Sequence, residues 1–336
     1  MAVTIHDIAK KVGVNPSTVS RVLNGKAAIS DETREKIFAA MEEMDYHPNS
    51  VARSLANGSS GAIGLAVDAH DNQAFANMFF SRSMLAIEKV AQANGFNVII
   101  SNNLEEKWKS SPIEKLMLER KVDGLILPPS MLTPKLIARM AQLDFPFVIL
   151  GEPNHSLPGA SWVDVNNTQG GEAAVAHLLD MGYQKIGYLG GSESQRFVKN
   201  RIKGYRRALE ARGISKSWVI QTDGSAEESE ALSGRLMESG DRPDAFLCND
   251  NITAYGLIKA AKEMRLCVPR DIGIAAFDNY PLAEYTDPPL TAVDIDTALL
   301  GEQAAALLFR RIGKHTPNQQ ILLSAALILR ESTKRV

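Results

Sequence analysis

The sequence predicts an α/β protein with a separate helical domain at its N-terminus. Three observations lead to this fold class. Residues 1–60 hold two short amphipathic helical patterns around a glycine, followed by a third helical pattern. From Gly61 onward, apolar runs typical of buried strands alternate with helical patterns, which predicts parallel sheets with helices on both faces. Because about ten such strands are too many for one ordinary sheet, we expect two similar subdomains with a cleft between them.

Length and composition fit a multidomain globular protein. At 336 residues the chain exceeds a typical single domain, and 45% hydrophobic with 23% charged residues is ordinary. The net charge of −2 does not indicate nucleic acid, and two cysteines, Cys248 and Cys267, make no disulfide framework. The N-terminus lacks a basic-then-apolar run, and no stretch approaches about 18 apolar residues. We therefore expect a cytoplasmic protein that does not contact the membrane.

The first helix is predicted directly after Thr4. Thr4 with Asp7 three residues later resembles a capping box, although Glu or Gln is the preferred partner. Gly13 then gives the tight turn that ends the helix. The apolar positions recur with helical spacing and form one face, made of Ile5, Ile8, Ala9 and Val12.

The second helix begins after that turn. Asn15 is a favourable N-cap, and Pro16 takes the first helical position, where its missing N–H costs nothing. The apolar residues expected to face the first helix are Val19, Val22 and Leu23. The residues left on the opposite side, where DNA could lie, are Thr18, Ser20 and Arg21. Two short helices around a glycine turn favour a helix-turn-helix, whose second helix enters the major groove; a plain three-helix bundle is the alternative.

A third helix is predicted to begin after Ser30 as N-cap and to end at Tyr46-His47-Pro48. Residues 1–60 hold seven basic and seven acidic side chains, so this domain is neutral overall. Between Ile8 and Ser30, however, there are four basic residues and no acid. Charge sorted in this way is what a phosphate-facing surface requires.

These motifs together resemble the lactose-repressor/galactose-repressor (LacI/GalR) family of transcription regulators. The N-terminal segments that carry the resemblance, in the family's order and spacing, are 18–24, 33–34, 46–49 and 51–56. Those in the core are 122–124, 182–187, 201–205, 249–250, 277–278 and 288–291. The resemblance implies a lambda-repressor-like helix-turn-helix domain over 1–60. It also implies a periplasmic-binding-protein-like core of two Rossmann-like subdomains over 61–336, used for effector binding and dimerisation.

The resemblance also implies which residues contact DNA. In the helical domain they would be Ile5, Asn15, Pro16, Ser17, Thr18, Ser20, Arg21, Asn24, Ser30, Thr33, Tyr46 and Asn49. In the family the residues at positions 16 and 17 help to choose the operator, but a proline and a serine discriminate poorly between bases. We therefore expect specificity to depend more on Arg21 and Arg53.

A hinge helix is expected at about 49–57. The resemblance implies that Ala52, Arg53 and Leu55 lie in the minor groove, with Leu55 wedged between base pairs. The plain alternative for Leu55 is an ordinary helical core residue. Because the segment is too short to be a stable isolated helix, we expect it to order only beside its dimer mate on DNA. Residues 57–61, Asn-Gly-Ser-Ser-Gly, predict a flexible joint.

The core is expected to alternate between its two subdomains. The candidate strands are 62–67, 97–100, 124–127, 147–150, 162–165, 186–189, 219–221, 245–248, 272–276 and 292–295. Helical patterns between them include 172–181, 202–212 and 252–264. The resemblance places the N-subdomain at about 61–161 and 293–320, and the C-subdomain at about 162–292 and 321–336.

Loops at the carboxyl ends of the strands would line the cleft. The candidate effector contacts are Phe79, Glu152, Phe197, Arg201, Asn249 and Asp278. Arg201 is expected to open a helix, Asp278 and Asn249 to offer hydrogen bonds at strand ends, and Phe79 to pack on a ring face. A surface or interdomain salt bridge is the plain alternative for Arg201 and Asp278.

This mixture of side chains suits a sugar or a sugar phosphate, but four positions depart from sugar-binding relatives. They are Glu152, where relatives often have Arg, Gly224, where several have an aromatic, and Pro128 and Ile295, where some have polar residues. Another sugar, a sugar phosphate or a non-sugar metabolite therefore stays open as the effector.

No metal, nucleotide or catalytic motif accompanies these residues, so we expect no cofactor and no enzymatic activity. We interpret the chain as a homodimeric repressor of a carbohydrate-use operon, bound to pseudo-palindromic DNA in the bacterial nucleoid and controlled by a small-molecule effector. A leucine heptad tail is missing, which argues against a tail-mediated tetramer. One alternative is a protein corepressor in place of the small molecule. Another is a solute-binding protein, although the predicted helix-turn-helix domain and the missing basic-then-apolar run at the N-terminus argue against it. A sugar-modifying enzyme would need an acid/base pair that the sequence does not offer.

Overall fold

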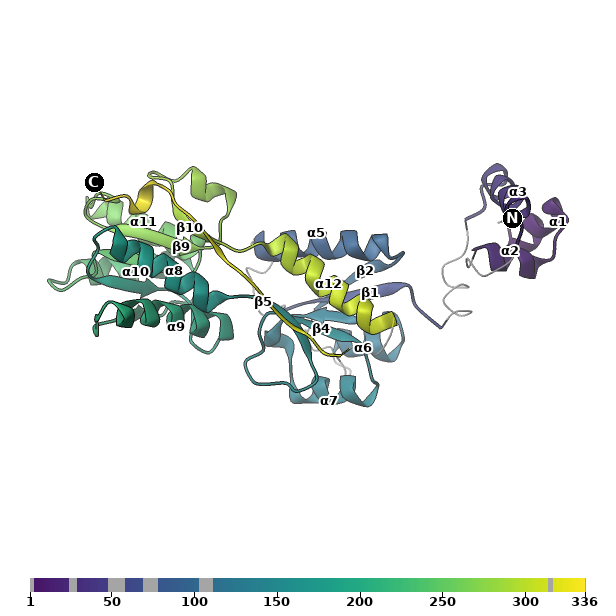
Figure 1. Cartoon of the computed structure of the whole chain (residues 1–336), viewed down its shortest axis with the longest axis horizontal. Helices are drawn as coiled ribbons and strands as arrows, with labels where there is room; N and C mark the ends of the chain where they lie inside the picture. The colour runs from purple at the N-terminus through teal and green to yellow at the C-terminus, as the bar shows by residue number, and fades with distance from the viewer. Residues whose placement is uncertain are drawn as a thin grey trace. The chain divides into compact units, whose positions relative to one another are not determined.

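The computed structural model describes residues 3–23, 29–47, 58–68, 78–102, 111–313 and 317–335. It divides into two compact units, Met1–Gly61 and Ala62–Val336 (Figure 1). This division lies one residue beyond the predicted boundary between the helical domain and the core.

The first unit contains α1 (Ile5–Val12), α2 (Pro16–Leu23) and α3 (Asp31–Glu43). The Asp7 carboxylate accepts hydrogen bonds from the backbone N–H and the hydroxyl of Thr4, at 2.8 and 2.6 Å, and so secures the start of α1. Gly13, with φ of +75°, ends that helix in the left-handed conformation. The three helices enclose a small apolar core of Ile8, Ala9, Val19, Val22, Ile37 and Ala40.

The first sheet of the core is six-stranded and parallel, in the order β11-β5-β4-β3-β1-β2. In that order the strands span Gln320–Leu323, Ser161–Val165, Phe147–Leu150, Leu125–Leu127, Ala62–Val67 and Asn97–Asn102. The helices packed on it are α5 (Met78–Ala93), α6 (Pro112–Leu118), α7 (Pro134–Gln142) and α12 (Thr297–Gly313), with the 3-10 turn η1 (Pro129–Met131).

Both faces of this first sheet are buried. Ile63 and Leu65 of β1 belong to the apolar cluster that includes α5 and α12, whereas Ala62 and Ala66 belong to the cluster that includes α6 and α7. Alternate residues of a strand point to opposite faces, so β1 must be apolar throughout. This explains the continuous apolar run that predicted the strand.

The second sheet is also six-stranded, in the order β12-β10-β9-β8-β6-β7, and only β12 runs antiparallel to its neighbour. In that order the strands span Ala326–Ile328, Thr291–Asp294, Gly273–Phe277, Ala245–Cys248, Ile186–Leu189 and Trp218–Ile220. One face packs on α8 (Asn167–Asp180) and α9 (Arg196–Ala211), the other on α10 (Ala226–Met237) and α11 (Asn251–Glu263). The 3-10 turns are η2 (Pro281–Glu284) and η3 (Glu331–Thr333).

The chain passes between the two sheets three times, after β5, after β10 and after β11. All ten predicted strands are present, but the subdomain limits predicted at 161/162, 292/293 and 320/321 need correction. Strands β5 and β11 belong to the first sheet, and β10 continues to Asp294. A chain leaves a sheet only after its strand is complete, so the crossings follow Val165, Asp294 and Leu323.

Two glycines bring α8 and α9 into backbone contact. A Cβ atom on Gly204 of α9 would lie 2.1 Å from the carbonyl oxygen of Thr168, and one on Gly171 of α8 would lie 2.5 Å from that of Arg201. These distances are far below van der Waals contact, so only glycine fits at either position. The close packing fixes the part of α9 that carries Arg201 against the start of α8.

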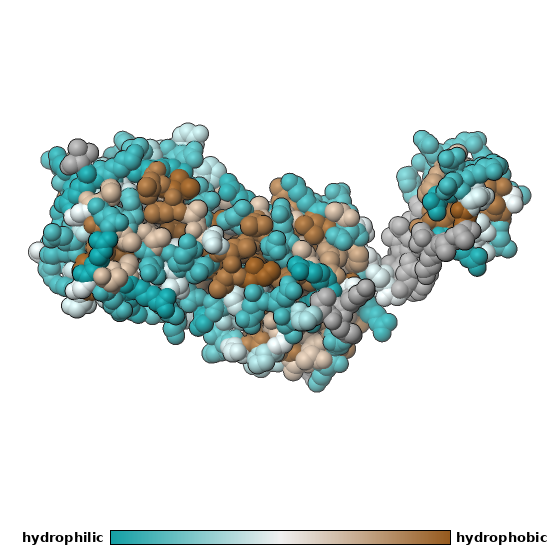
Figure 2. Space-filling model, viewed as in Figure 1, coloured by the Kyte–Doolittle hydropathy of each residue, from teal (hydrophilic) through white to brown (hydrophobic). Residues whose placement is uncertain are grey.

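Some apolar side chains of the core remain at its surface. Figure 2 shows apolar residues on the visible face over α5 and α12. Leu85 on α5 and Ile100 on β2 are 55% and 45% exposed. No helix within the described ranges combines the length and the apolar content that crossing a bilayer requires.

Candidate functional site

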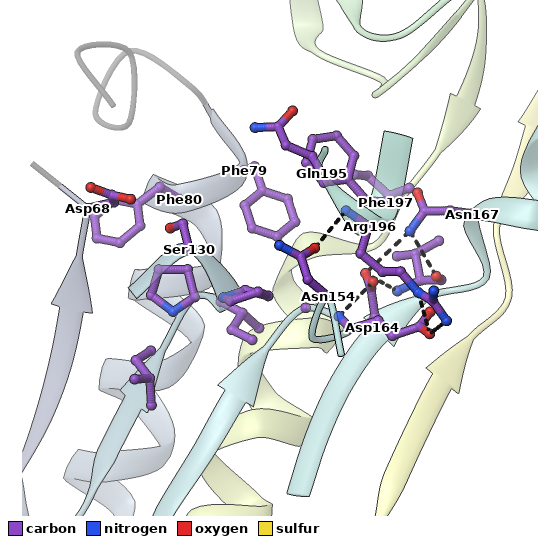
Figure 3. Close-up of a pocket in the computed structure, with 18 of the residues that line it drawn as sticks. Asp68, Phe79, Phe80, Ser130, Asn154, Asp164, Asn167, Gln195, Arg196 and Phe197 are labelled. Carbon is purple, nitrogen blue, oxygen red and sulfur yellow. Dashed lines mark hydrogen bonds and ion pairs between the residues drawn. The ribbon is translucent and has the colours of Figure 1, made fainter. Parts of the chain in front are cut away.

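A cavity of about 320 Å³ lies within the core, where the two subdomains meet. Its walls come from the carboxyl ends of strands in both sheets, as expected for this sheet architecture. All six predicted effector contacts line it, namely Phe79, Glu152, Phe197, Arg201, Asn249 and Asp278. Figure 3 shows two of them, Phe79 and Phe197, beside other lining residues. The structure therefore brings together side chains that lie up to two hundred residues apart in the sequence.

Arg201 lines this cavity and is buried against two aromatic rings. Its guanidinium carbon is 4.0 Å from the ring centroid of Phe277 and 4.9 Å from that of Phe197. Phe197 precedes Arg201 by four residues, so both lie on one face of α9. The prediction that Arg201 opens a helix was wrong, because α9 begins at Arg196 and Arg201 lies in its second turn.

The nitrogens of Arg201 are held by groups of the protein. Nε donates to Asn167 Oδ1 at 2.9 Å, and Nη1 donates to the backbone carbonyl of Asn249. Nη2 lies 3.8 Å from Asp278 Oδ1, and both side chains of that pair are less than a tenth exposed. Arg201 and Asp278 thus form an ion pair, but it is buried in the cavity wall within the second subdomain, and not on the surface or between subdomains as the alternative interpretation had it.

Asn249 follows β8 and reaches the cavity, but its amide group is already paired. Its Oδ1 accepts from the hydroxyl of Tyr188 at 2.8 Å, and its Nδ2 donates to Asp250 Oδ2 at 2.9 Å. The Asn249 amide keeps a second N–H and a second lone pair beyond these two bonds, so its predicted use as both donor and acceptor for a ligand stays a prediction.

Two buried carboxyls of the cavity have raised pKa values. Burial raises the pKa of Asp278 to about 6, although the positive charge of Arg201 opposes this. Burial likewise raises the pKa of Asp164 to about 6, although it accepts hydrogen bonds from the backbone N–H groups of Glu152 and Val165. At neutral pH both groups are mainly ionised and lie ready to accept hydrogen bonds.

Glu152 joins the two subdomains at the cavity. It follows β4 of the first sheet, and its Oε1 accepts from Nε and Nη2 of Arg196 at 2.8 and 2.6 Å. Its Oε2 accepts from Nδ2 of Asn200 at 2.7 Å. Asn154, from the same loop as Glu152, accepts from the backbone N–H of Arg196 at 3.0 Å (Figure 3). Arg196 and Asn200 both belong to α9 of the second subdomain.

The sequence prediction missed several polar residues of the cavity, namely Asp68, Asn154, Asp164, Asn167, Gln195 and Arg196. Asp68 follows β1 directly, and such a polar residue at a strand end was a usable signal. Pro128 and Ile295 do line the cavity, whereas Gly224 is not among the lining residues. Within the described part of the chain, no group of His, Cys, Asp or Glu side chains could hold a metal ion.

The predicted DNA contacts on α2 lie at the surface of the helical domain. Asn15, Ser17 and Arg21 are exposed, while Pro16, Thr18 and Ser20 are half-buried. Asn15 Oδ1 accepts from the backbone N–H of Ser17 at 3.2 Å, which supports the start of α2. The remaining predicted contacts at Asn24, Asn49, Ala52, Arg53 and Leu55, and the hinge helix at 49–57, lie outside the described residues.

The other predicted DNA contacts have structural partners. Ser30 caps α3 and accepts from the backbone N–H of Thr33, and the two hydroxyls are 2.9 Å apart. Ile5 and Tyr46 pack partly against the small apolar core. Each of these four side chains therefore also supports the domain that presents α2.

Two family models match the chain. One, described as "Bacterial regulatory proteins, lacI family", matches residues 4–49, and the other, described as "Periplasmic binding protein-like domain", matches residues 175–333. Among curated relatives, the HTH-type transcriptional regulator DegA of Bacillus subtilis is 33% identical over 99% of this chain and 98% of its own. The ribose operon repressor of Halalkalibacterium halodurans is 32% identical over 98% and 97%. The HTH-type transcriptional repressor PurR of Photobacterium profundum is 30% identical over 98% of both chains.

Solved structures resemble this chain over most or nearly all of its length. The lac repressor dimer bound to operator and the anti-inducer ONPF has a TM-score of 0.81 with 29% identity, covering 99% of both chains. The complex of the transcriptional regulator CelR with cellobiose has a TM-score of 0.72 with 27% identity, covering 98% of this chain and 99% of that one. A LacI family regulator of Enterococcus faecium with bound ribose has a TM-score of 0.71 with 26% identity, covering 82% and 99%.

Proposed function

The chain belongs to the lacI family of bacterial regulatory proteins, and on this premise we propose that it is a repressor whose operator affinity is set by a small molecule in the core cavity. One observation carries the proposal. The chain that bears the helix-turn-helix also forms a cavity between two subdomains, and all six predicted effector contacts line it. We propose that the cavity binds its ligand without catalysis, in keeping with a family of regulators.

We propose that α2 reads the major groove of a pseudo-palindromic operator. Arg21 is exposed near the end of α2, and a guanidinium can donate to both acceptors of a guanine edge. The predicted contacts that lie outside the described residues complete this surface, with Leu55 as the minor-groove wedge. The protein would then act on nucleoid DNA in the bacterial cytoplasm.

Two-fold symmetric operator half-sites call for a homodimer. The exposed apolar side chains Leu85 and Ile100 on the first subdomain support this, because burial against a second copy would remove them from water. The lac repressor structure described above is likewise a dimer on its operator.

We propose a sugar or a related polyol as the effector. Buried carboxylates of Asp164 and Asp278 can accept from hydroxyls, and the ring of Phe79 can cover a C–H face (Figure 3). CelR and the Enterococcus faecium regulator hold cellobiose and ribose. The alternative is a protein corepressor acting on the same core.

The proposed mechanism is a shift in population between two poses of the subdomains. The three crossings after Val165, Asp294 and Leu323 are the covalent links between the two halves of the core. A ligand that prefers one pose changes the spacing of the two first subdomains in a dimer. This changes how well the predicted hinge helices order on DNA, so effector and operator affinities become coupled.

Selection of bound sequences from a randomised duplex library tests the DNA-reading half. The wild type should enrich a two-fold symmetric site, and R21A should lose base preference within each half-site. The control variant is K36A, because Lys36 pairs with Glu32 on α3 at 2.7 Å and is not a predicted contact. No enriched palindrome, or an unchanged preference in R21A, would refute the proposed reading surface.

Thermal-shift screening of sugars and other metabolites tests the ligand half, because a ligand that binds the folded state raises the melting temperature. At least one neutral sugar should stabilise the wild type in a saturable way. If no small molecule stabilises the protein, a protein corepressor becomes the better account.

A further inference from the structure

The cavity carries an excess of negative charge. Its described lining residues include five carboxylates, those of Asp68, Glu152, Asp164, Asp250 and Asp278. Against these stand the two guanidinium groups of Arg196 and Arg201. With pKa values of about 6, Asp164 and Asp278 add to this negative charge at neutral pH. A ligand that brings a further anion into this space must therefore find a cation that is able to receive it.

Arg201 is poorly placed to receive an anion. The aromatic rings of Phe197 and Phe277 both pack on its guanidinium group, with centroids 4.9 and 4.0 Å from the guanidinium carbon. Its edge is directed at three groups of the protein, Asn167 Oδ1, the carbonyl of Asn249 and the Asp278 carboxylate. A phosphate or carboxylate is bound best by two parallel N–H groups of one guanidinium. Either such pair on Arg201 includes Nη2, which lies 3.8 Å from Asp278 Oδ1, so an anion bound there would lie beside a carboxylate of like charge.

Arg196 is the second cation of the cavity, and it forms an ion pair with Glu152. Two of its nitrogens, Nε and Nη2, donate to one oxygen of Glu152, so the side of the guanidinium that would hold an oxyanion already holds a carboxylate. The second oxygen of Glu152 is fixed by Asn200. The Glu152 side chain is 17% exposed, so water screens this pair only in part.

We infer that the cavity selects an uncharged or amine-bearing polyol and excludes phosphorylated and carboxylated ligands, and that Glu152 imposes this by neutralising Arg196. The inference narrows the proposed effector class and rests on the proposed function only in treating the bound molecule as an effector. Glu152 is here a specificity-determining residue. Its carboxylate pairs with Arg196, the arginine that the phosphate group of a sugar phosphate would otherwise bind.

Inorganic phosphate is the probe that tests this inference without knowledge of the effector or the operator. The melting temperature of the full chain is followed in sodium phosphate against sodium chloride at matched ionic strength. Phosphate is excluded from protein surfaces and raises the melting temperature of every variant gradually with concentration, so only a saturable rise reports binding. The wild type should show no saturable rise. E152Q leaves the positive charge of Arg196 uncompensated, so phosphate should raise its melting temperature saturably by about 2 °C or more.

The matched control is E193Q. Glu193 lies just before α9 and pairs with Arg206 at 3.5 Å, and it does not line the cavity, so this variant removes the same charge without exposing a cavity arginine. It should gain no phosphate response. A double variant, E152Q with R196Q, should lose the response that E152Q gains, which assigns the phosphate to Arg196.

Each other outcome overturns part of the inference. A saturable phosphate response in the wild type would refute the exclusion of anions. No response in either the wild type or E152Q would refute the role given to Glu152, and an equal gain in E193Q would reduce it to general electrostatics. A core that binds no sugar at all would defeat the proposed function but leave these phosphate results as they are.

Discussion

Arg201 combines a buried charge with aromatic packing, so its removal should be costly. R201A would leave the Asp278 carboxylate buried without its cation and would remove the guanidinium group that packs on Phe197 and Phe277. We expect a loss of about 3 kcal/mol in the free energy of unfolding, measured by urea denaturation. R206A on the same helix is the control, because Arg206 is exposed and its ion pair should contribute less than about 1 kcal/mol. Equal losses in the two variants would contradict this account of Arg201.

Asp164 should make stability depend on pH. Burial raises its carboxyl pKa from 3.8 to about 6, so the folded state holds the proton more tightly than the unfolded chain. This contribution is fully present below about pH 4 and is lost as the pH rises through about 6. D164N cannot ionise, so relative to the wild type it should gain up to about 3 kcal/mol between pH 4 and pH 7. Unfolding free energies of the two proteins that run parallel over this range would refute the pKa shift.

At the scale of single residues, the candidate ligand contacts of the site were largely predictable, but the protein side chains that hold them in place were not. The six candidate contacts could be named from residue type, strand ends and family resemblance, and all of them line the cavity. Arg196 and Asn167 were missed because each acts through a residue far away in sequence, Glu152 in one case and Arg201 in the other. Neither partner is visible in local sequence spacing.

Among the elements, the contact between α8 and α9 gives the sharpest prediction. G204A places a methyl group against the carbonyl of Thr168, and rigid helix backbones must separate to admit it. We expect a loss of about 3 kcal/mol or more in unfolding free energy. G234A in α10 is the matched control, since a Cβ there meets nothing within 4 Å, and it should stabilise by about 0.5–1 kcal/mol. A G204A variant as stable as G234A would show that α8 and α9 can move apart freely.

The predicted elements failed where the sequence lacks a local signal. α9 was predicted to begin at Ile202 rather than Arg196, because its N-cap residue, Gln195, makes no side-chain cap. α8 was predicted to begin at Glu172 but begins at Asn167, and Gly171 inside it is required for the close approach of α9. Strands β11 and β12 were missed because they are short, half-exposed edge strands. Tertiary contacts decide all of these positions.

For the whole molecule, periodicity alone predicted a helical domain and a two-sheet core. The three crossings between the sheets were approximated from family resemblance, but their positions depend on which sheet each strand completes, as β5 and β11 show. The positions of the crossings are decided only by which strands pair in the folded protein. The cavity follows from the same topology, because the carboxyl ends of both sheets meet where the chain crosses.

The central claim is that the ligand cavity and the DNA-reading helices are coupled. The most direct measurement is operator affinity with and without the sugar that raises the melting temperature, together with sugar affinity with and without operator. We predict that the sugar changes operator affinity by a factor of about 5 or more, and that operator changes sugar affinity by the same factor. A sugar that binds the cavity but leaves operator affinity unchanged would contradict the account.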